Sequence, residues 1–308
     1  KHTTDSKTSF VFLSEQNEHI RLGGAMPTAT TKLDTYKSSL LHAHQLTDSF
    51  ELEVGTSYTL MKENEASQES TEAMDDKEAL DAQVKLTAKE DKNTLFVSVA
   101  RKSRMPAMSE MFTFFSFAPA NKNVKPERSW QYATGYNYAL GEKSKMNVEL
   151  YYYDVNDVII ETNNGFVNKG SAEHYGAECR IDTKALDKNS IRISYAYANV
   201  QDDKNKDLAF TPHHKIILQD TIEISNTINA FLSYVYTSSQ YTNNFPSDLD
   251  TLYKIQGYHL FDAQVSYKMK DEFSARVGIK NISDENYQWQ YGFPAQGRSF
   301  YLSIEWKI

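Results

Sequence analysis

Apolar and polar residues alternate with a period of two through most of this 308-residue chain, and this pattern constrains the fold more than any other feature. It is clear in residues 50–60, 80–89 and 261–269, where every second side chain except Thr56 is apolar. It also continues through residues 298–308, although chain ends are usually frayed and polar. Because successive side chains of a strand point to opposite faces, the chain is predicted to be all-β, with one apolar face on each strand.

The alternating segments are long. About fifteen strands of about 10 to 13 residues are predicted, whereas strands of soluble proteins cluster near five or six residues. Strands of this length can cross a lipid bilayer at a tilt. The predicted strands are 5–14, 18–25, 33–46, 50–60, 80–89, 93–102, 129–140, 144–155, 172–186, 190–200, 212–223, 226–237, 261–269, 272–281 and 298–308.

Short polar turns alternate with long connections along the chain. The long segments are 61–79, 103–128, 156–171, 201–211, 238–256 and 282–297. Outer-membrane barrels have short periplasmic turns and longer extracellular loops. The pattern therefore predicts a transmembrane antiparallel up-and-down β-barrel whose long segments are extracellular. The alternative is a soluble sandwich, in which the apolar faces would pack against each other.

Composition excludes several classes of protein. The net charge of -8 argues against a nucleic-acid binder, which needs clustered Lys and Arg. Mean hydropathy of -0.60 and the lack of a long apolar run exclude a spanning helix but not a membrane barrel. Cys179 cannot form an internal disulfide, because it is the single cysteine, and it is expected to be an ordinary strand residue.

Two boxes in one long segment resemble a known family. Residues 103–112 contain Arg104, Pro106 and Glu110, and residues 121–130 contain Pro126 and Glu127. They resemble the paired "R-x-P-x-x-x-E" and "N-P-x-L-K-P-E" boxes of TonB-dependent outer-membrane receptors. The second box departs from the family at Lys122, where the family has proline, and at Val124, where it has leucine.

Further motifs follow in the order of that family. Gly176 and Glu178 match its "G-x-E" strand start, and Pro212 lies in a "T-P-x-H" box. The end of the chain resembles its last hairpin in the residues Asn281, Gly297, Arg298 and Phe300. The chain ends in Ile308, where the family mostly ends in Phe.

The resemblance implies a receptor in the bacterial outer membrane that is not an enzyme. It implies uptake of a scarce metal chelate, foremost a ferric siderophore, with energy from the TonB system. The expected partners are the chelate, the TonB complex, outer-membrane lipid and the barrel assembly machinery, with no cofactor and no nucleic acid. Nothing in the chain resembles the family's plug or its TonB-contacting box. Residues 1–308 are therefore expected to be the C-terminal part of the barrel, about fifteen strands of a probable 22.

Aromatic residues of the long segments are the candidate ligand-binding residues, because exposed aromatic clusters often mark a ligand surface. The alternative is that these side chains pack loop against loop or against the plug. The candidates are Phe112, Phe114, Phe115, Tyr287, Trp289, Tyr291 and Phe293.

Other sites are less favoured. His213 and His214 are adjacent, so on a strand they point to opposite faces and cannot share one metal ion. Family members that take haem place a His between the two boxes, and 103–129 contains none, so haem is disfavoured. The acidic run 63–78 lacks a regular ligand spacing and is more plausibly a solvated loop than a calcium site.

Residues 172–186 illustrate how the faces of a strand are expected to divide. Glu178, Arg180 and Asp182 fall on one polar face and are expected to line the barrel lumen, where they can pair across strands. The residues between them, Cys179 and Ile181, are expected to face lipid.

Two alternatives keep the barrel but change its function. One is a passive porin or adhesin without energy coupling. The other is a barrel hydrolase with His213, His214 and Asp262 at its rim, although no nucleophile and base stand at a defined spacing.

Overall fold

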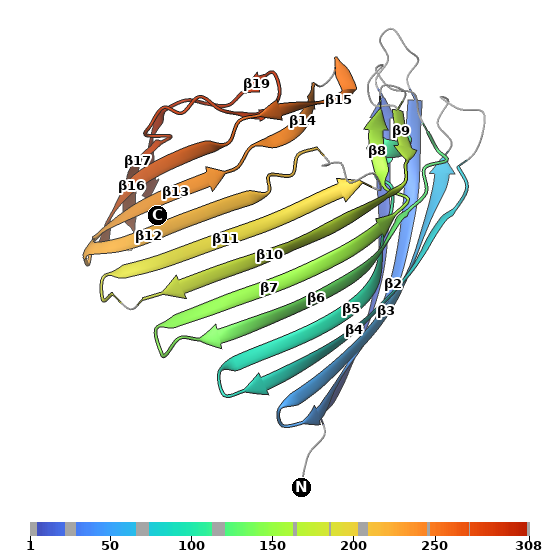
Figure 1. Cartoon of the computed structure of the whole chain (residues 1–308), viewed down its shortest axis with the longest axis horizontal. Helices are drawn as coiled ribbons and strands as arrows, with labels where there is room; N and C mark the ends of the chain where they lie inside the picture. The colour runs from blue at the N-terminus through green and yellow to red at the C-terminus, as the bar shows by residue number, and fades with distance from the viewer. Residues whose placement is uncertain are drawn as a thin grey trace.

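The computed structural model describes residues 5–21, 29–65, 74–112, 121–162, 165–184, 186–202, 209–244, 247–270 and 272–306. These residues form one 14-stranded antiparallel sheet and three two-stranded hairpins. Each strand inside the large sheet pairs with the strands before and after it in chain order, and the two end strands have one partner each (Figure 1). The predicted all-β, up-and-down architecture is confirmed.

The strands of the large sheet are 8 to 19 residues long. They are β1 (Ser6–Arg21), β2 (Ala29–Thr47), β3 (Phe50–Glu65), β4 (Lys77–Glu90), β5 (Asn93–Arg104), β6 (Glu127–Ala139), β7 (Ser144–Asn156), β10 (Ser171–Thr183), β11 (Asn189–Asp202), β12 (His214–Ser225), β13 (Ile228–Thr237), β16 (Tyr258–Lys270), β17 (Phe273–Lys280) and β20 (Ser299–Trp306).

Three long segments contain small hairpins that the sequence pattern did not predict. They pair β8 (Ile159–Thr162) with β9 (Gly165–Asn168), β14 (Gln240–Asn244) with β15 (Asp248–Ile255), and β18 (Gln288–Gln290) with β19 (Phe293–Pro294). A single helical turn, α1 (Met108–Met111), follows β5. In the described part of the chain, no helix has both the length and the apolar character that a membrane crossing requires.

One predicted break between strands is wrong, and other strand ends differ from the prediction by a few residues. The segments 5–14 and 18–25 were expected as two strands, because the polar residues between them interrupt the alternation. The structure instead pairs β1 with β2 without a break from Ser6 opposite His44 to Arg21 opposite Ala29. A ladder is held by backbone hydrogen bonds, so a polar run within it does not end the strand. Residues 22–25 of the second predicted strand lie outside the described residues.

The tight turns lie at one end of the sheet and the long connections at the other, as the sequence predicted. Figure 1 shows the β2–β3, β4–β5, β6–β7, β10–β11, β12–β13 and β16–β17 connections at one edge. The small hairpins β8–β9, β14–β15 and β18–β19 lie at the opposite edge. The long segments therefore share one end of the molecule, which we call the loop end.

Burial along the strands is the reverse of that in a soluble protein. On β4 the apolar side chains Leu80, Val84 and Leu86 are 57%, 48% and 42% exposed, whereas the intervening Asp81 and Thr87 are 8% exposed. A soluble sandwich would bury its apolar faces. Here they form an exposed outer surface, which suits contact with lipid acyl chains and excludes the sandwich.

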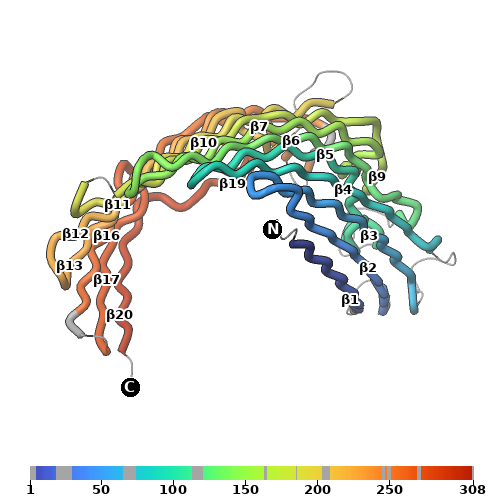
Figure 2. The backbone as a smooth tube through the Cα atoms, turned by 90° about the horizontal axis from the view of Figure 1, so that it is seen from below, coloured from blue at the N-terminus to red at the C-terminus, as the bar shows by residue number. Residues whose placement is uncertain are grey.

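The sheet is strongly curved but does not close. Figure 2 shows it as an arch, with β1 and β20 at its two ends. Among the described residues, no ladder joins β1 to β20. The fold is therefore an open part of an up-and-down barrel, as expected for fewer strands than a complete barrel has.

A charge on the outer face should destabilise the folded protein far more than the same charge on the inner face. Val97 lies on the outer face of β5 and is 52% exposed, and its neighbour Ser98 points to the inner face. We expect Val97→Arg to cost roughly 2–4 kcal/mol of unfolding free energy in lipid vesicles. Ser98→Arg is the control and should cost much less. Equal costs in urea titrations of the two variants would contradict the assignment of the faces.

Candidate functional site

The described apolar core of this protein lies at the loop end rather than within the sheet. Its buried members come from the loop ends of strands and from the long segments between them: Leu33, Met61, Met74, Met111, Phe112, Val124 and Ile159. Met105, Met108 and Phe166 pack against them. We call this set the loop core. It joins the described parts of the segments 61–79, 103–128 and 156–171 into one packed layer, which we call the loop layer.

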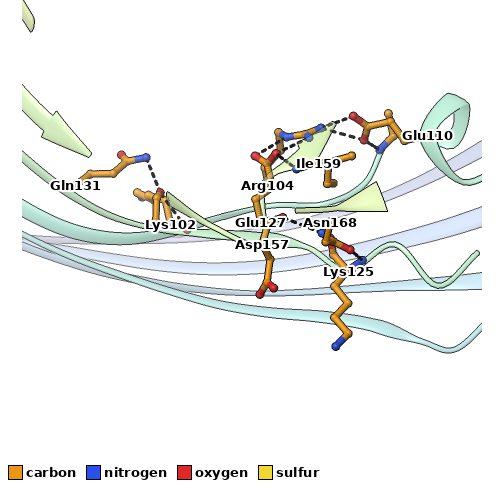
Figure 3. Close-up of polar contacts among 11 residues, drawn as sticks. Lys102, Arg104, Glu110, Lys125, Glu127, Gln131, Asp157, Ile159 and Asn168 are labelled. Atoms are coloured by element: carbon orange, nitrogen blue, oxygen red, sulfur yellow. Dashed lines mark hydrogen bonds and ion pairs between the residues drawn. The ribbon is translucent and has the colours of Figure 1, made fainter. Parts of the chain in front are cut away.

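The two sequence boxes meet at Arg104 (Figure 3). Arg104 ends β5 and Glu127 begins β6 directly opposite it. The Arg104 guanidinium donates to both carboxylate oxygens of Glu127, at 2.8 Å each, and to both of Glu110, at 3.0 Å each. Two carboxylates therefore satisfy one guanidinium in the fork geometry that arginine favours.

Glu110 and Glu127 also accept hydrogen bonds from backbone amides. The Glu110 carboxylate accepts a hydrogen bond from the Ala107 amide at 2.7 Å, which stabilises the start of α1. The Glu127 carboxylate accepts one from the Ile159 amide at 2.8 Å, which anchors β8. Pro106 is fully buried and Pro126 is buried. The box residues Arg104, Pro106, Glu110, Pro126 and Glu127 thus form the frame of the loop layer.

The electrostatics of this frame favour the charged forms of Arg104 and Glu127. Burial alone would raise the pKa of Glu127, but hydrogen bonds from Arg104 and the Ile159 amide, together with the charge of Arg104, hold it below its usual value. The hydrogen bond to Glu127 likewise raises the pKa of Arg104. Both groups belong to the loop layer, above the part of the sheet that would span a membrane.

Asn168 was not identified from the sequence, yet it connects the second box to the β8–β9 hairpin (Figure 3). Its side-chain oxygen accepts from the Lys125 amide at 2.7 Å, and its Nδ2 donates to the Lys125 and Asp157 carbonyls at 2.9 and 2.7 Å. An isolated Asn in a long segment carries no recognisable signal, because its partners Lys125 and Asp157 are 43 and 11 residues away in the sequence.

The departure from the family at Lys122 has a structural role. Lys122 and Glu63 form an ion pair at 2.9 Å, and their side chains are only 7% and 4% exposed. The Lys122 ammonium also lies 5.5 Å from the centre of the Phe112 ring. The Lys77 ammonium donates to the Lys122 carbonyl at 2.8 Å. Glu63, one of the acidic residues weighed for calcium, is therefore used in a buried contact between two loops.

The last long segment has a separate hydrogen-bonded frame. Asn281 is 4% exposed, donates its amide to Asp262 at 2.8 Å and accepts from the Glu285 amide at 2.8 Å. Asp284 accepts from the Arg298 amide at 2.8 Å, and a Cβ at Gly297 would come within 2.9 Å of the same carboxylate. The motif residues Asn281, Gly297 and Arg298 therefore shape this loop.

Aromatic side chains gather on this loop. Trp289, Tyr291 and Phe293 are 63%, 40% and 50% exposed. Tyr287 is half-buried, and its ring centre lies 4.5 Å from that of Tyr258 and 6.1 Å from that of Trp289. These four candidates thus occupy one short stretch of the loop end, and we call them the aromatic loop.

The aromatic loop is supported from below by the β14–β15 hairpin. Thr242 is 0% exposed and its hydroxyl oxygen accepts from the Tyr291 amide at 2.9 Å. Gln290 donates to Asn243 at 3.1 Å, and the rings of Tyr291 and Tyr253 stack at 4.4 Å. The exposed rings therefore stand on a fixed backbone. The sequence did not indicate this support, because the β14–β15 hairpin was not predicted.

Of the three candidates in the segment 103–128, the structure describes only Phe112. Phe112 is 3% exposed and belongs to the loop core, so it does not contribute to an exposed ligand surface and fits the loop-packing alternative. The physical reason is that α1 ends at Met111 and turns the next side chain inward. Phe114 and Phe115 lie outside the described residues.

The remaining motif residues have structural roles. A Cβ at Gly176 would collide with the Tyr197 carbonyl oxygen and the Tyr151 ring, which explains the glycine of the "G-x-E" start. Glu178 is exposed and lies directly opposite Glu149. Phe300 is 72% exposed on the terminal strand β20, and Pro212 is half-buried just before β12.

The face expected to line the lumen carries the cross-strand pairing that was predicted for it. Asp182 accepts hydrogen bonds from Arg180 at 2.9 Å and from Arg192, on the neighbouring strand, at 2.7 Å. Cys179 lies on the other face, opposite Val148 and Tyr195.

The structure separates the residues considered for a metal or for hydrolysis. His214 bonds to the Tyr195 hydroxyl at 2.9 Å on the outer face, whereas Asp262 points to the inner face and holds the Asn281 amide. A rim hydrolase built on His214 and Asp262 has no support in this geometry. Within the described ranges, no group of three His, Cys, Asp or Glu residues is placed to hold a metal ion.

The Glu127 contacts should make the loop layer sensitive to acid. Because the pKa of Glu127 is lowered by folding, its contribution is complete above the unfolded value of about 4.3 and is lost as pH falls through the lower folded value. We expect protection of the Ile159 amide against hydrogen exchange, corrected for the intrinsic rate, to fall in that acidic range.

Glu127→Gln should lower this protection at neutral pH and flatten its pH dependence. Glu142→Gln, in the exposed turn between β6 and β7, is the matched control and should behave like the unaltered protein. A pH profile unchanged by Glu127→Gln would show that Glu127 does not control this contact.

The buried ion pair of Lys122 and Glu63 leads to a second prediction for the loop layer. Lys122→Met leaves the Glu63 carboxylate buried without its cation, so local unfolding of the loop layer should become easier by roughly 3–5 kcal/mol. Replacing both residues, as Lys122→Met with Glu63→Leu, should recover most of this loss, since an apolar pair often matches a buried ion pair in stability. Native-state proteolysis measures both free energies, and equal losses in the single and double variants would contradict the role of the pair.

Comparison with solved structures agrees with the fold. The chain is similar to the ferric-catecholate import receptor Fiu from E. coli K12, with a TM-score of 0.73, 14% identity, and coverage of 98% of this chain and 51% of that one. The siderophore receptor PiuA from Acinetobacter baumannii gives a TM-score of 0.72 at 15% identity, over 90% of this chain and 44% of that one. The copper transporter OprC gives a TM-score of 0.80 at 16% identity, over 99% of this chain and 55% of that one. The chain thus spans about half the length of these proteins.

Comparison with protein families identifies the chain more directly. Residues 45–282 match the family described as TonB dependent receptor-like, beta-barrel. This range holds both boxes, the "G-x-E" start and the "T-P-x-H" box, in agreement with the resemblance drawn from the motifs. The chain therefore belongs to the β-barrel family of TonB-dependent receptors, which are proteins of the outer membrane of Gram-negative bacteria.

Proposed function

We propose that the protein containing this chain takes up a scarce metal chelate, foremost a ferric siderophore, across the outer membrane with energy from the TonB system. Membership of the TonB-dependent receptor family supports the class of transporter. Two of the structurally similar proteins are a ferric-catecholate import receptor and a siderophore receptor, which supports the class of ligand.

The observation that carries the proposal is the aromatic loop. Tyr287, Trp289, Tyr291 and Phe293 stand at the loop end, which would face the outside of the cell. Flat, exposed rings on a fixed backbone lose little conformational entropy when they bind a ligand. Catecholate and other aromatic groups of a chelate can stack on such rings.

We also propose that residues 1–308 are the C-terminal part of a barrel of 22 strands. The open edges of β1 and β20 each leave a row of backbone groups unpaired, and such an edge cannot stand in lipid. Coverage of about half of each similar structure agrees with this view. In this proposal, further strands of the same protein close the barrel, and contact with the TonB complex lies outside residues 1–308.

Uptake is tested with a strain that lacks the gene for this protein. We expect the deletion to abolish growth on one class of ferric chelate as the sole iron source, and deletion of the TonB system to have the same effect. Growth that depends on this protein but not on the TonB system would instead indicate a passive porin. Unchanged growth on every iron, cobalamin and nickel chelate tried would contradict the proposal.

The aromatic loop is tested by substitution. Trp289→Ala together with Tyr291→Ala should weaken binding of the chelate identified in that strain by at least about tenfold, because each removes an exposed ring from the contact surface. Trp306→Ala is the matched control, since Trp306 is 73% exposed on β20, far from the loop end. Whole-cell binding of the radiolabelled chelate measures both. An equal effect of the two changes would place the ligand elsewhere.

A further inference from the structure

Methionine makes up half of the loop core. Met61, Met74 and Met111 are 8%, 6% and 0% exposed, and Met105 and Met108 pack against them. The chain has 8 methionines in all, so most of them gather at this one place. Ordinary cores use Leu, Ile, Val and Phe and contain methionine sparingly.

The methionines come from three separate segments. Met61 lies near the end of β3, and Met74 lies shortly before β4. Met105, Met108 and Met111 follow one another at intervals of three residues, and the last two begin and end α1. Side chains three residues apart on a helical turn lie on the same side. The fold therefore packs methionine side chains into one cluster from positions up to 50 residues apart in the sequence.

The surroundings favour a soft ligand chemistry. The thioether is an uncharged, polarizable sulfur group that binds Cu(I) in preference to hard cations. The carboxylates of this layer are already engaged. Glu63 is paired with Lys122 at 2.9 Å and accepts the Met74 amide at 2.7 Å, and Glu110 and Glu127 are paired with Arg104. The loop core therefore offers mainly sulfur to an incoming ion.

The cluster has a dry side and a side open to solvent. Met111 is fully buried, whereas Met105 and Met108 are only half-buried. Met105 and Met108 are therefore the members of the cluster that solvent reaches. A monovalent ion held by uncharged sulfurs needs less charge compensation in an apolar site than a divalent one.

We propose that the thioethers of Met61, Met74, Met105, Met108 and Met111 form a binding site for one soft monovalent metal ion, Cu(I), in the loop layer. Not every sulfur need bind at once, because Cu(I) is satisfied by few ligands. Binding involves no electron transfer, since the ion arrives in the monovalent state. A bound ion would join the segment 61–74 to the segment 105–111. The site is separate from the aromatic loop, so it does not depend on the proposed chelate uptake.

Silver(I) is the probe of choice, because it is a soft monovalent ion that does not change its oxidation state in air. The whole protein, purified from outer membranes in detergent, is titrated with Ag(I) and the bound ion is counted after gel filtration. The test variant carries Met105→Leu, Met108→Leu and Met111→Leu. Leucine nearly conserves the volume of methionine, so the loop core should remain packed while three sulfurs are removed.

Met146→Leu is the matched control, because Met146 lies on β7 opposite Ile181, outside the loop core. We expect the unaltered protein and the control to bind one Ag(I) that Cu(I) displaces. The triple variant should bind Ag(I) more weakly by more than about tenfold, since even changes to outer-shell groups weaken metal binding by 10- to 100-fold. Heat-modifiable electrophoretic mobility verifies that each variant is folded.

Two results would overturn the proposal. One is the absence of stoichiometric Ag(I) binding by the folded, unaltered protein. The other is equal binding by the unaltered protein and the folded triple variant, which would place any silver outside the loop core. If the triple variant does not fold, Met105→Leu with Met108→Leu, at the half-buried positions, provides the same comparison. Either negative result would leave the uptake of a chelate by the aromatic loop unaffected.

Discussion

The structure depends on one constraint, which is that a backbone in contact with lipid must satisfy its hydrogen bonds within the protein. Long antiparallel ladders meet this requirement strand by strand, from β1 paired with β2 to β17 paired with β20. The same constraint reverses the usual arrangement of side chains. Apolar residues such as Leu80 and Val84 cover the outside, and polar residues such as Asp81 are enclosed by the curved sheet.

In the part of the chain that the structure describes, the main cluster of buried apolar side chains does not lie within the sheet. The loop core lies at the loop ends of the strands, where three long segments bury apolar side chains against one another. Arg104 with its two carboxylates, and Lys122 with Glu63, add charged contacts among the same segments. The last long segment, which carries Trp289, has its own hydrogen-bonded frame around Asn281 and Thr242. The loop end is therefore an ordered surface.

Much of the fold could be predicted from the sequence, because alternation is a local signal. The strands, the face of each side chain and the end at which the long segments lie all follow from a period of two and from turn composition. The predicted break within β1 was wrong, since Glu15 and Asn17 interrupt the pattern but not the backbone ladder. The small hairpins were missed because β18 and β19, with three and two residues, are too short to show a period.

The loop end was less predictable, because its contacts join residues far apart in the chain. The boxes identified Arg104, Glu110 and Glu127, but neither their shared ion pairs nor the partners Asn168 and Ile159 could be seen in the sequence. The sequence predicts Phe112 as a ligand contact, whereas the structure buries it after the end of α1. An aromatic residue in a long segment has the same local signal whether it is packed or exposed.

The central claim is that alternate side chains of these strands face lipid. A scan of single nitroxide labels at positions 95–100 of β5, in a Cys179→Ser background and in lipid vesicles, tests it most directly. We expect collisions with dissolved oxygen to be frequent at 95, 97 and 99, and collisions with a water-soluble nickel chelate to be rare there, with the reverse balance at 96, 98 and 100. Equal accessibility at all six positions, or oxygen exposure at the even ones, would contradict the account.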